Sequence, residues 1–216
     1  WDSIAYNSKG KWYDLLREKA ADIANCGITM VWLPPAVRSV SQQGYMPTDY
    51  YDLGKDDNST FYGNLNTLSR CIKKLHEKKL FVIADIVINH RCAGKQDENG
   101  IWNVYHFESG LAKWEKWAIC GNDNQFNGSG NHDTGAEYGA APDIDHVNTQ
   151  VIEDIKKWMK WMKGLGFDGW RYDFAKGFSS NYIKEYNDAT STGFSVGEYW
   201  TSLVYESPNN PAYNQD

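Results

Sequence analysis

The chain lacks any run of about 18 apolar residues, the length that a membrane-spanning helix needs, and it lacks any cluster of lysine or arginine. Its formal net charge is −6, so nucleic acid is a poor partner and no basic patch predicts attachment to a membrane surface. The four cysteines form no Cys-x-x-Cys pair, which argues against a zinc ribbon or a thioredoxin-like site. We expect Cys26 and Cys71 to be buried small hydrophobes on helices, whereas a pairing of Cys92 with Cys120 is open.

Both ends of the chain lack the signals of a natural boundary. It opens at Trp1 with no initiator methionine or signal peptide, and it closes at Asp216 in a stretch rich in proline and asparagine. Its 216 residues suffice for one large domain or one and a half. We therefore expect the sequence to be cut from a longer chain.

Aromatic side chains, in contrast, are abundant. They make up 15% of the residues, with ten tryptophans and fourteen tyrosines. A rich core explains most of them. The functional alternative is sugar binding, because pyranose rings stack their apolar C–H faces on aromatic planes, and only aromatic residues beside polar strand ends support it.

Helices and strands alternate along the chain. The spacing of apolar residues predicts helices over residues 11–25 and 65–78, with strands over 28–33 and 81–88. Such a helix–strand order favours parallel strands joined by right-handed crossovers. The alternation returns near the end, with helices over 149–163 and 180–189 and strands over 167–174 and 194–200.

Residues 91–145 interrupt this alternation. They are rich in glycine, asparagine and aspartate and show no clear period. A loop of this length is unusual in a compact domain unless it is functional. We therefore predict an inserted subdomain over 91–145, between a first part of the main domain at 1–90 and a second part at 146–216.

Polar side chains stand where the predicted strands end. Arg171 and Asp173 are two residues apart near the end of an apolar strand, so they point to the same face. His90 and Glu198 end two other runs that we expect to be central strands, buried on both faces. The carboxyl ends of parallel strands usually carry catalysis, although a structural ion pair is the alternative.

Two carboxylates from neighbouring strands, one beside a fixed arginine, suit glycoside hydrolysis. We expect Asp173, beside Arg171, to stay ionised and to act as a nucleophile. Glu198 stands in a more apolar setting between Gly197 and Tyr199, where it can hold a proton and act as an acid.

Three segments sharpen this hypothesis. Residues 85–90, 169–173 and 196–198 occur in the order of the first three of four signature segments of the α-amylase family, which they resemble. Four further stretches are similar to the plant-type α-amylases in particular, namely residues 32–35, 44–47, 89–93 and 141–146. Nothing in the chain matches the fourth signature segment, which carries a third catalytic aspartate.

The resemblance implies an α/β fold, a (β/α)₈ TIM barrel with an irregular calcium-binding domain inserted after the third strand. The chain would hold strands two to five, and the first strand would precede Trp1. Because eight strands close such a barrel, we expect a fragment that is inactive alone.

The same resemblance implies an endo-acting α-1,4-glucan hydrolase that retains anomeric configuration. Asp173 would be the nucleophile, Glu198 the general acid/base, and Arg171 would hold the nucleophile. Contacts to the glucan would come from His90, Lys176 and Tyr45. An α-glucosidase or transglycosidase of the same clan is one alternative, and a non-catalytic, calcium-stabilised glucan-binding fragment is another. An α-glucan is the expected partner of a monomer whose location stays open, with secretion favoured.

Calcium needs several oxygens from carboxylates, amides and carbonyls. The resemblance assigns one ion to the side chains of Asn89, Asp133 and Asp143 and to the carbonyls of Ala136 and Gly177. It assigns Asp123 and Glu137 to a neighbouring second site. A further plant-type site is poorly preserved here, with Glu108 its one match, and a solvated acidic loop is the alternative for the whole region.

Overall fold

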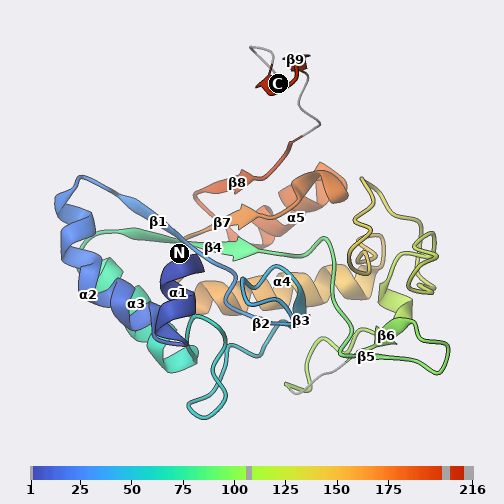
Figure 1. Ribbon diagram of the computed structural model, residues 1–216, viewed down its shortest axis with the longest axis horizontal. Helices are drawn as coiled ribbons and strands as arrows, with labels where there is room; N and C mark the ends of the chain where they lie inside the picture. The colour runs from blue at the N-terminus through green and yellow to red at the C-terminus, as the bar shows by residue number, and fades with distance from the viewer. Residues whose placement is uncertain (1, 106–108, 201–204, 212–216) are drawn as a thin grey trace.

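A computed structural model describes residues 2–105, 109–200 and 205–211, and a parallel sheet lies at its centre (Figure 1). The sheet has four strands in the order β1-β4-β7-β8. The strands are β1 (Met30–Leu33), β4 (Phe81–Ile86), β7 (Gly169–Tyr172) and β8 (Ser195–Gly197). Strands that pair in chain order, each parallel to the last, form an arc of the predicted βα array.

Four helices accompany the strands: α2 (Trp12–Asn25), α3 (Leu65–Glu77), α4 (Thr149–Gly164) and α5 (Ser180–Thr190). The helix α3 begins where Asn64 and Thr67 exchange side-chain-to-backbone hydrogen bonds in a capping box. Along the chain, α2 packs on α3 and α4 packs on α5. The predicted order of helices and strands is confirmed, and the strands are shorter than predicted.

The register brings the ends of three strands level. Asp85 of β4 pairs with Arg171 of β7, and Arg171 pairs with Val196 of β8. Every residue of β7 is buried. Side chains that follow these strands therefore meet at one edge of the sheet, which faces the insert in Figure 1.

The prediction that every strand is buried on both faces is wrong for the two outer strands. All three residues of β8 are exposed, and β1 is buried only at Leu33. The reason is that β1 and β8 each have a partner on one side only. The prediction of a buried Cys26 is also wrong, since it is exposed, whereas Cys71 is buried and all four cysteines are free.

The remaining elements are short. They are α1 (Asp2–Ser8), β2 (Arg38–Ser39), β3 (Pro47–Asp49), β5 (Lys95–Gln96), β6 (Trp102–Val104), η1 (Lys116–Ala118), η2 (Ala175–Gly177), β9 (Tyr205–Ser207) and β10 (Asn210–Pro211). Between residues 91 and 145 the chain is otherwise irregular, as predicted. Its far end returns to the sheet, where the N–H of Ile144 donates to the carbonyl of Asn89 at 2.8 Å. Within the described residues, no helix has the length and apolar character needed to cross a bilayer.

Candidate active site

Arg171 and Asp173 meet at the end of β7. The Nη1 of Arg171 lies 2.7 Å from the Oδ1 of Asp173, and both residues are buried. The N–H of Asp173 still donates to the carbonyl of Ile86, so the residue continues the ladder directly after the strand. This contact confirms the prediction that the two side chains share a face.

Arg171 holds two further carboxylates. Its Nη1 lies 2.9 Å from the Oδ1 of Asp85, and its Nη2 lies 3.1 Å from the Oε1 of Glu198. One guanidinium therefore joins carboxylates that come from three neighbouring strands. With one positive charge among three negative ones, the site keeps a net negative charge when all are ionised.

Asp85, to which no sequence pattern assigned a role, is the centre of this network. Its side chain is fully buried and accepts hydrogen bonds from the indole of Trp32 at 3.1 Å and the hydroxyl of Tyr45 at 2.9 Å. Burial raises the pKa of Asp85 to about 6, although Arg171 and the two donors oppose that shift. A lone carboxylate inside a buried apolar strand was the signal that would have identified it.

Asp173 does not have the low pKa that a neighbouring arginine was expected to give. Burial raises the pKa of Asp173, the charge of Asp85 raises it further, and Arg171 lowers it. Burial is the main cause of the raised pKa, and the expectation that Asp173 stays ionised beside Arg171 stays a prediction. Asp173 is ionised only above its raised pKa.

Glu198 is not in the apolar setting that the sequence suggested. Its side chain is 37% exposed at the edge of the sheet, and it accepts a hydrogen bond from the N–H of Phe174 at 3.2 Å as well as from Arg171. Phe174 adopts a left-handed backbone, with φ 44° and ψ 49°. This conformation is strained in a residue other than glycine.

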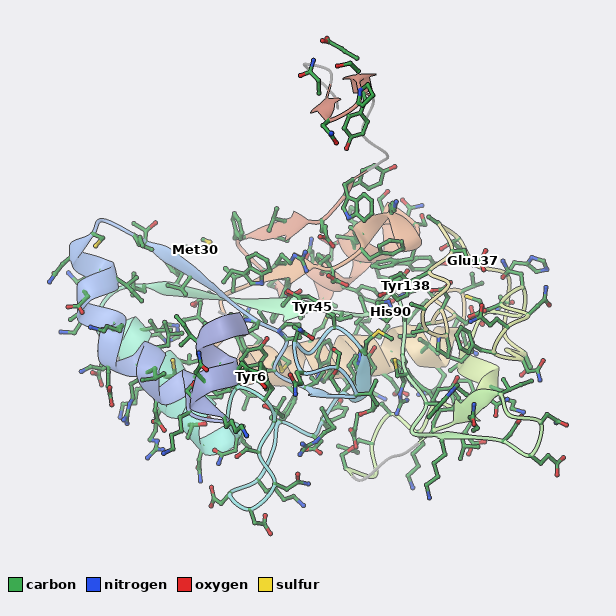
Figure 2. The ribbon with its side chains drawn as sticks, in the orientation of Figure 1. Tyr6, Met30, Tyr45, His90, Glu137 and Tyr138 are labelled. Carbon is green, nitrogen blue, oxygen red and sulfur yellow. The ribbon has the colours of Figure 1, made fainter. Side chains whose placement is uncertain are left out.

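His90 is buried between Tyr45 and Tyr138, and Figure 2 shows the three just beyond the end of β4. Its Nε2 lies 2.8 Å from the carbonyl oxygen of Tyr45 and so donates to it, while its ring stacks on Tyr138 with centroids 4.1 Å apart. Burial lowers the pKa of His90 to about 4, which keeps the ring neutral. Its other nitrogen faces the side-chain amide of Asn89 at 3.4 Å. The expected contact of His90 with sugar stays a prediction.

Lys176 lies beside Trp200, an aromatic residue that was not predicted from the sequence. Its ammonium is 4.3 Å from the ring centroid of Trp200 and 5.2 Å from that of Phe174. Trp200 is 55% exposed and follows Glu198 by two residues. Sugar stacking is expected at aromatic residues beside polar strand ends. Trp200 stands in such a position, so this expectation would have identified it.

Asn89 and Asp143, which are 54 residues apart, touch. The Nδ2 of Asn89 donates to the Oδ1 of Asp143 at 2.9 Å, while the Oδ1 of Asn89 is buried without a hydrogen-bond partner. That oxygen points at Gly177, where an added Cβ would come within 1.8 Å of it. The N–H of Ala136 donates to the carbonyl of Lys176 at 3.0 Å. The structure therefore brings the segments of these predicted ligands together.

This contact belongs to a cluster of four carboxylates, which are Asp143 itself, Asp123, Asp133 and Glu137. Burial raises the pKa of Asp143 to about 8, and the charges of Asp133 and Asp123 add to it. None of the four carboxylates has a lysine or arginine partner within the part of the chain that the structure describes. Among the same residues, no three His, Cys, Asp or Glu side chains form a group that could hold a metal ion. An orphaned amide oxygen beside uncompensated carboxylates and carbonyls is the donor set that fits a hard cation. Glu108 lies outside the described residues.

Residues 16–215 match the family described as alpha amylase, catalytic domain. The chain belongs to the alpha-amylase family. It is 43% identical to "Alpha-amylase 3, chloroplastic" of Arabidopsis thaliana, a match that covers 100% of this chain and 23% of that protein. It is 37% identical to "Probable alpha-amylase 2" of the same plant, over 100% of this chain and 49% of the relative. The chain therefore spans half or less of the length of these two relatives.

Solved structures of alpha-amylases share the fold. A maltogenic alpha-amylase from Thermotoga neapolitana matches with a TM-score of 0.64 at 20% identity, covering 88% of this chain and 42% of that one. An alpha-amylase from Malbranchea cinnamomea matches with a TM-score of 0.62 at 21% identity, covering 86% and 40%. The four-stranded sheet is thus part of the TIM-barrel architecture of the alpha-amylase family.

Proposed function

We propose that the protein carrying this chain is an α-amylase that cleaves α-1,4-glucosidic bonds within starch-type or glycogen-type glucans. One observation carries the proposal: the guanidinium of Arg171 contacts both Asp173 and Glu198 at the carboxyl edge of the sheet. A retaining glycosidase needs two carboxyl groups about 5 Å apart on one face, and a shared arginine keeps the pair close. Membership of the alpha-amylase family supports the same reaction.

The reaction follows from these positions. Glu198 gives a proton to the glycosidic oxygen while a carboxylate oxygen of Asp173 attacks the anomeric carbon, so the C–O bond to the leaving sugar breaks as the glycosyl ester forms. Glu198 then takes a proton from a water molecule, whose oxygen displaces Asp173 at the same carbon. The two inversions leave the product in the α configuration.

A groove beside the site supports binding within a chain rather than at its end. It encloses about 310 Å³ and includes Met46, Cys92 and Trp102. The hydroxyl of Tyr138, whose ring stacks on His90, lies 3.9 Å from the Sδ of Met46, so the groove begins beside the proposed site. Its mostly apolar wall, with Trp102 half exposed, suits the apolar faces of successive glucose units.

The insert would bind calcium through Asn89, Asp133, Asp143 and the carbonyls of Ala136 and Gly177, with Asp123 and Glu137 beside them. The ion would supply positive charge to these carboxylates and hold residues 91–145 against the sheet. Tyr138 connects this cluster with the site, because its N–H donates to the Oδ2 of Asp143 at 3.1 Å and its ring stacks on His90.

The test replaces each carboxylate in the intact protein. We expect Asp173→Asn to lower kcat on soluble starch by at least about 10³-fold, because the attacking oxygen is lost. Glu198→Gln should do the same on starch and should spare substrates whose leaving groups need no proton. Asp188→Asn is a matched control, since Asp188 is exposed on α5.

The products separate the alternatives. Proton NMR of a fresh digest should show α-anomers first, and β-anomers first would contradict the retaining mechanism. Large products early in the digest support endo-cleavage, whereas release of glucose alone points to an α-glucosidase and transfer to an added sugar points to a transglycosidase. Glucan binding with no turnover would identify a non-catalytic binding protein.

A further inference from the structure

Trp32 of β1 touches both members of the ion pair that Asp85 forms with Arg171. Its indole Nε1 donates to the Oδ2 of Asp85 at 3.1 Å, and the guanidinium carbon of Arg171 lies 4.8 Å from its ring centroid. Trp32 pairs with Ile83, which lies two residues before Asp85 on the same strand. Asp85 pairs in turn with Arg171. The side chains of Trp32, Asp85 and Arg171 therefore point to one face of the sheet.

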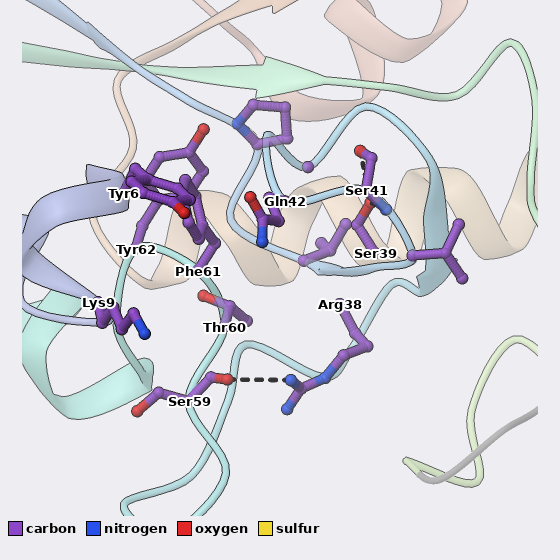
Figure 3. Close-up of a pocket in the computed structure, with 15 residues that line it drawn as sticks. Tyr6, Lys9, Arg38, Ser39, Ser41, Gln42, Ser59, Thr60, Phe61 and Tyr62 are labelled. Carbon is purple, nitrogen blue, oxygen red and sulfur yellow. Dashed lines mark hydrogen bonds between the residues drawn. The ribbon is translucent and has the colours of Figure 1, made fainter. Parts of the chain in front are cut away.

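Trp32 is not simply a packing residue. It is 39% exposed, whereas Leu33, the next residue of β1, is fully buried. The indole N–H of Trp158, which packs in the core, is buried with no hydrogen-bond partner among the described residues, whereas that of Trp32 donates to a carboxylate. Nor does Trp32 line the pocket that Figure 3 shows between α1 and the loops after β1.

The two contacts of Trp32 favour the charged forms of both ions. A hydrogen bond donated to a carboxylate stabilises its ionised form, and the face of an indole ring attracts a guanidinium within about 6 Å. The indole nitrogen is a donor only, so it cannot accept a hydrogen bond from a protonated Asp85. The hydroxyl of Tyr45 donates to the same oxygen of Asp85 at 2.9 Å, and Arg171 donates to the other oxygen.

These contacts reach the proposed nucleophile through one nitrogen. The Nη1 of Arg171 lies 2.9 Å from the Oδ1 of Asp85 and 2.7 Å from the Oδ1 of Asp173. The charged and titratable groups around Asp85 are Arg171, Asp173, Tyr45 and, through the other guanidinium nitrogen, Glu198. An ionised Asp85 raises the pKa of Asp173, because the two carboxylates repel each other and share Nη1.

We propose that Trp32 is a positioning residue of the reaction, which holds the carboxylate of Asp85 with its N–H and the guanidinium of Arg171 with its ring. The inference rests on the proposed function, in which Asp173 attacks the anomeric carbon. Without the N–H, Asp85 keeps its proton to a higher pH, so Arg171 interacts more fully with Asp173. Asp173 then ionises at a lower pH, which means that Trp32 sets the lower pH limit of the reaction.

The pH dependence of kcat/KM on soluble starch tests this role in the intact protein. Trp32→Phe keeps a ring beside the guanidinium and removes the N–H. We expect its acid limb to move to lower pH by about half a unit or more, the shift that loss of one hydrogen bond can produce. Trp117→Phe is the matched control, because Trp117 is 37% exposed on η1 and should leave the acid limb in place.

A double variant shows whether Trp32 acts through Asp85. Asp85→Asn removes the charge on which the N–H acts, so adding Trp32→Phe to it should produce no further shift of the acid limb. A shift of equal size with and without Asp85→Asn overturns the positioning role. So does an unmoved acid limb in Trp32→Phe at an unchanged melting temperature, or a shift to higher pH.

A second substitution covers a loss of folding in Trp32→Phe. Benzothienylalanine at position 32 keeps the shape of the indole and replaces its N–H by sulfur, and an unmoved acid limb in that protein also overturns the proposal. The proposed function fails on a different result, namely turnover that survives Asp173→Asn, so the two failures are distinguishable.

Discussion

Two regions of the molecule concentrate carboxylates, and they balance the charge in different ways. At the sheet edge, Asp85, Asp173 and Glu198 share the guanidinium of Arg171. In the insert, Asp123, Asp133 and Asp143 lie together with only amide and backbone donors among the described residues. One region carries its own cation, whereas the described carboxylates of the other have no lysine or arginine partner.

The difference shows in the polar atoms around each region. Asp85 has three donors from side chains, which come from β1, from the loop before β3 and from β7. Asn89, at the insert, keeps a buried oxygen with no donor at all. A buried carbonyl oxygen without a partner is costly, so the insert gains most from an added positive ion. Three experiments break or sharpen this comparison.

The largest effect is expected from removing the built-in cation. Arg171→Met leaves three neighbouring carboxylates without their counter-charge, and such a loss costs about 3–5 kcal/mol of folding free energy when the partners are buried. We also expect kcat/KM on starch to fall by about 10²–10³-fold, because Asp173 and Glu198 lose the group that holds them. Urea unfolding and initial rates measure the two effects. Arg171→Lys keeps the charge and should recover part of the stability, whereas full activity in Arg171→Met would show that the shared arginine is dispensable.

A smaller effect is expected from the cation that the insert would recruit. An ion that binds only the folded protein stabilises it by about 2.7 kcal/mol at 100 times its dissociation constant. A chelator should therefore lower the melting temperature and the activity together, and added calcium should restore both. Asp143→Asn should reduce this response while Asp188→Asn keeps it. A melting temperature that changes with neither chelator nor calcium would contradict the calcium site and indicate that the acidic loop is solvated surface.

The smallest effect concerns pH. Burial raises the pKa of Asp85 to about 6, above the value of about 3.9 in an unfolded chain, so the folded state binds this proton more tightly. The stability from this group is present below pH 4 and is lost as the pH rises through 6. Asp85→Asn should flatten that decline in urea unfolding between pH 4 and 7.

The same substitution reports on the nucleophile. Because the charge of Asp85 raises the pKa of Asp173, its removal should move the acid limb of kcat/KM to lower pH. Glu206→Gln, on exposed β9, is the control. An acid limb that stays in place would mean that Asp85 does not set the ionisation of Asp173.

Local patterns in the sequence predicted the order of helices and strands well. Apolar spacing located α3 and α4 to within a residue or two, because their buried stripes repeat at helical steps and asparagine caps begin them. The pair Arg171 and Asp173 followed from the two-residue period of a strand. These features depend on neighbours in the chain, which a single sequence contains.

Features that depend on distant neighbours were not predicted. The exposure of Glu198 was missed because β8 is the last strand of the described sheet and has a partner on one side only. The sharing of Arg171 depends on the register between β4 and β7, which brings Asp85 beside it from 86 residues away. The contact of Asn89 with Asp143 was anticipated only through the family resemblance, because no period relates residues across the insert.

The left-handed backbone of Phe174 has a consequence for evolution in the laboratory. Glycine and asparagine adopt this conformation more readily, and a strained residue of this kind costs of order 1–3 kcal/mol. A library selected only for heat resistance should therefore enrich glycine or asparagine at position 174. A library selected for turnover should keep a residue whose ring packs on Tyr138, with ring centroids 5.1 Å apart. The two selections should enrich different residues at position 174. Sequencing both pools would show whether thermal stability and catalysis favour different residues there.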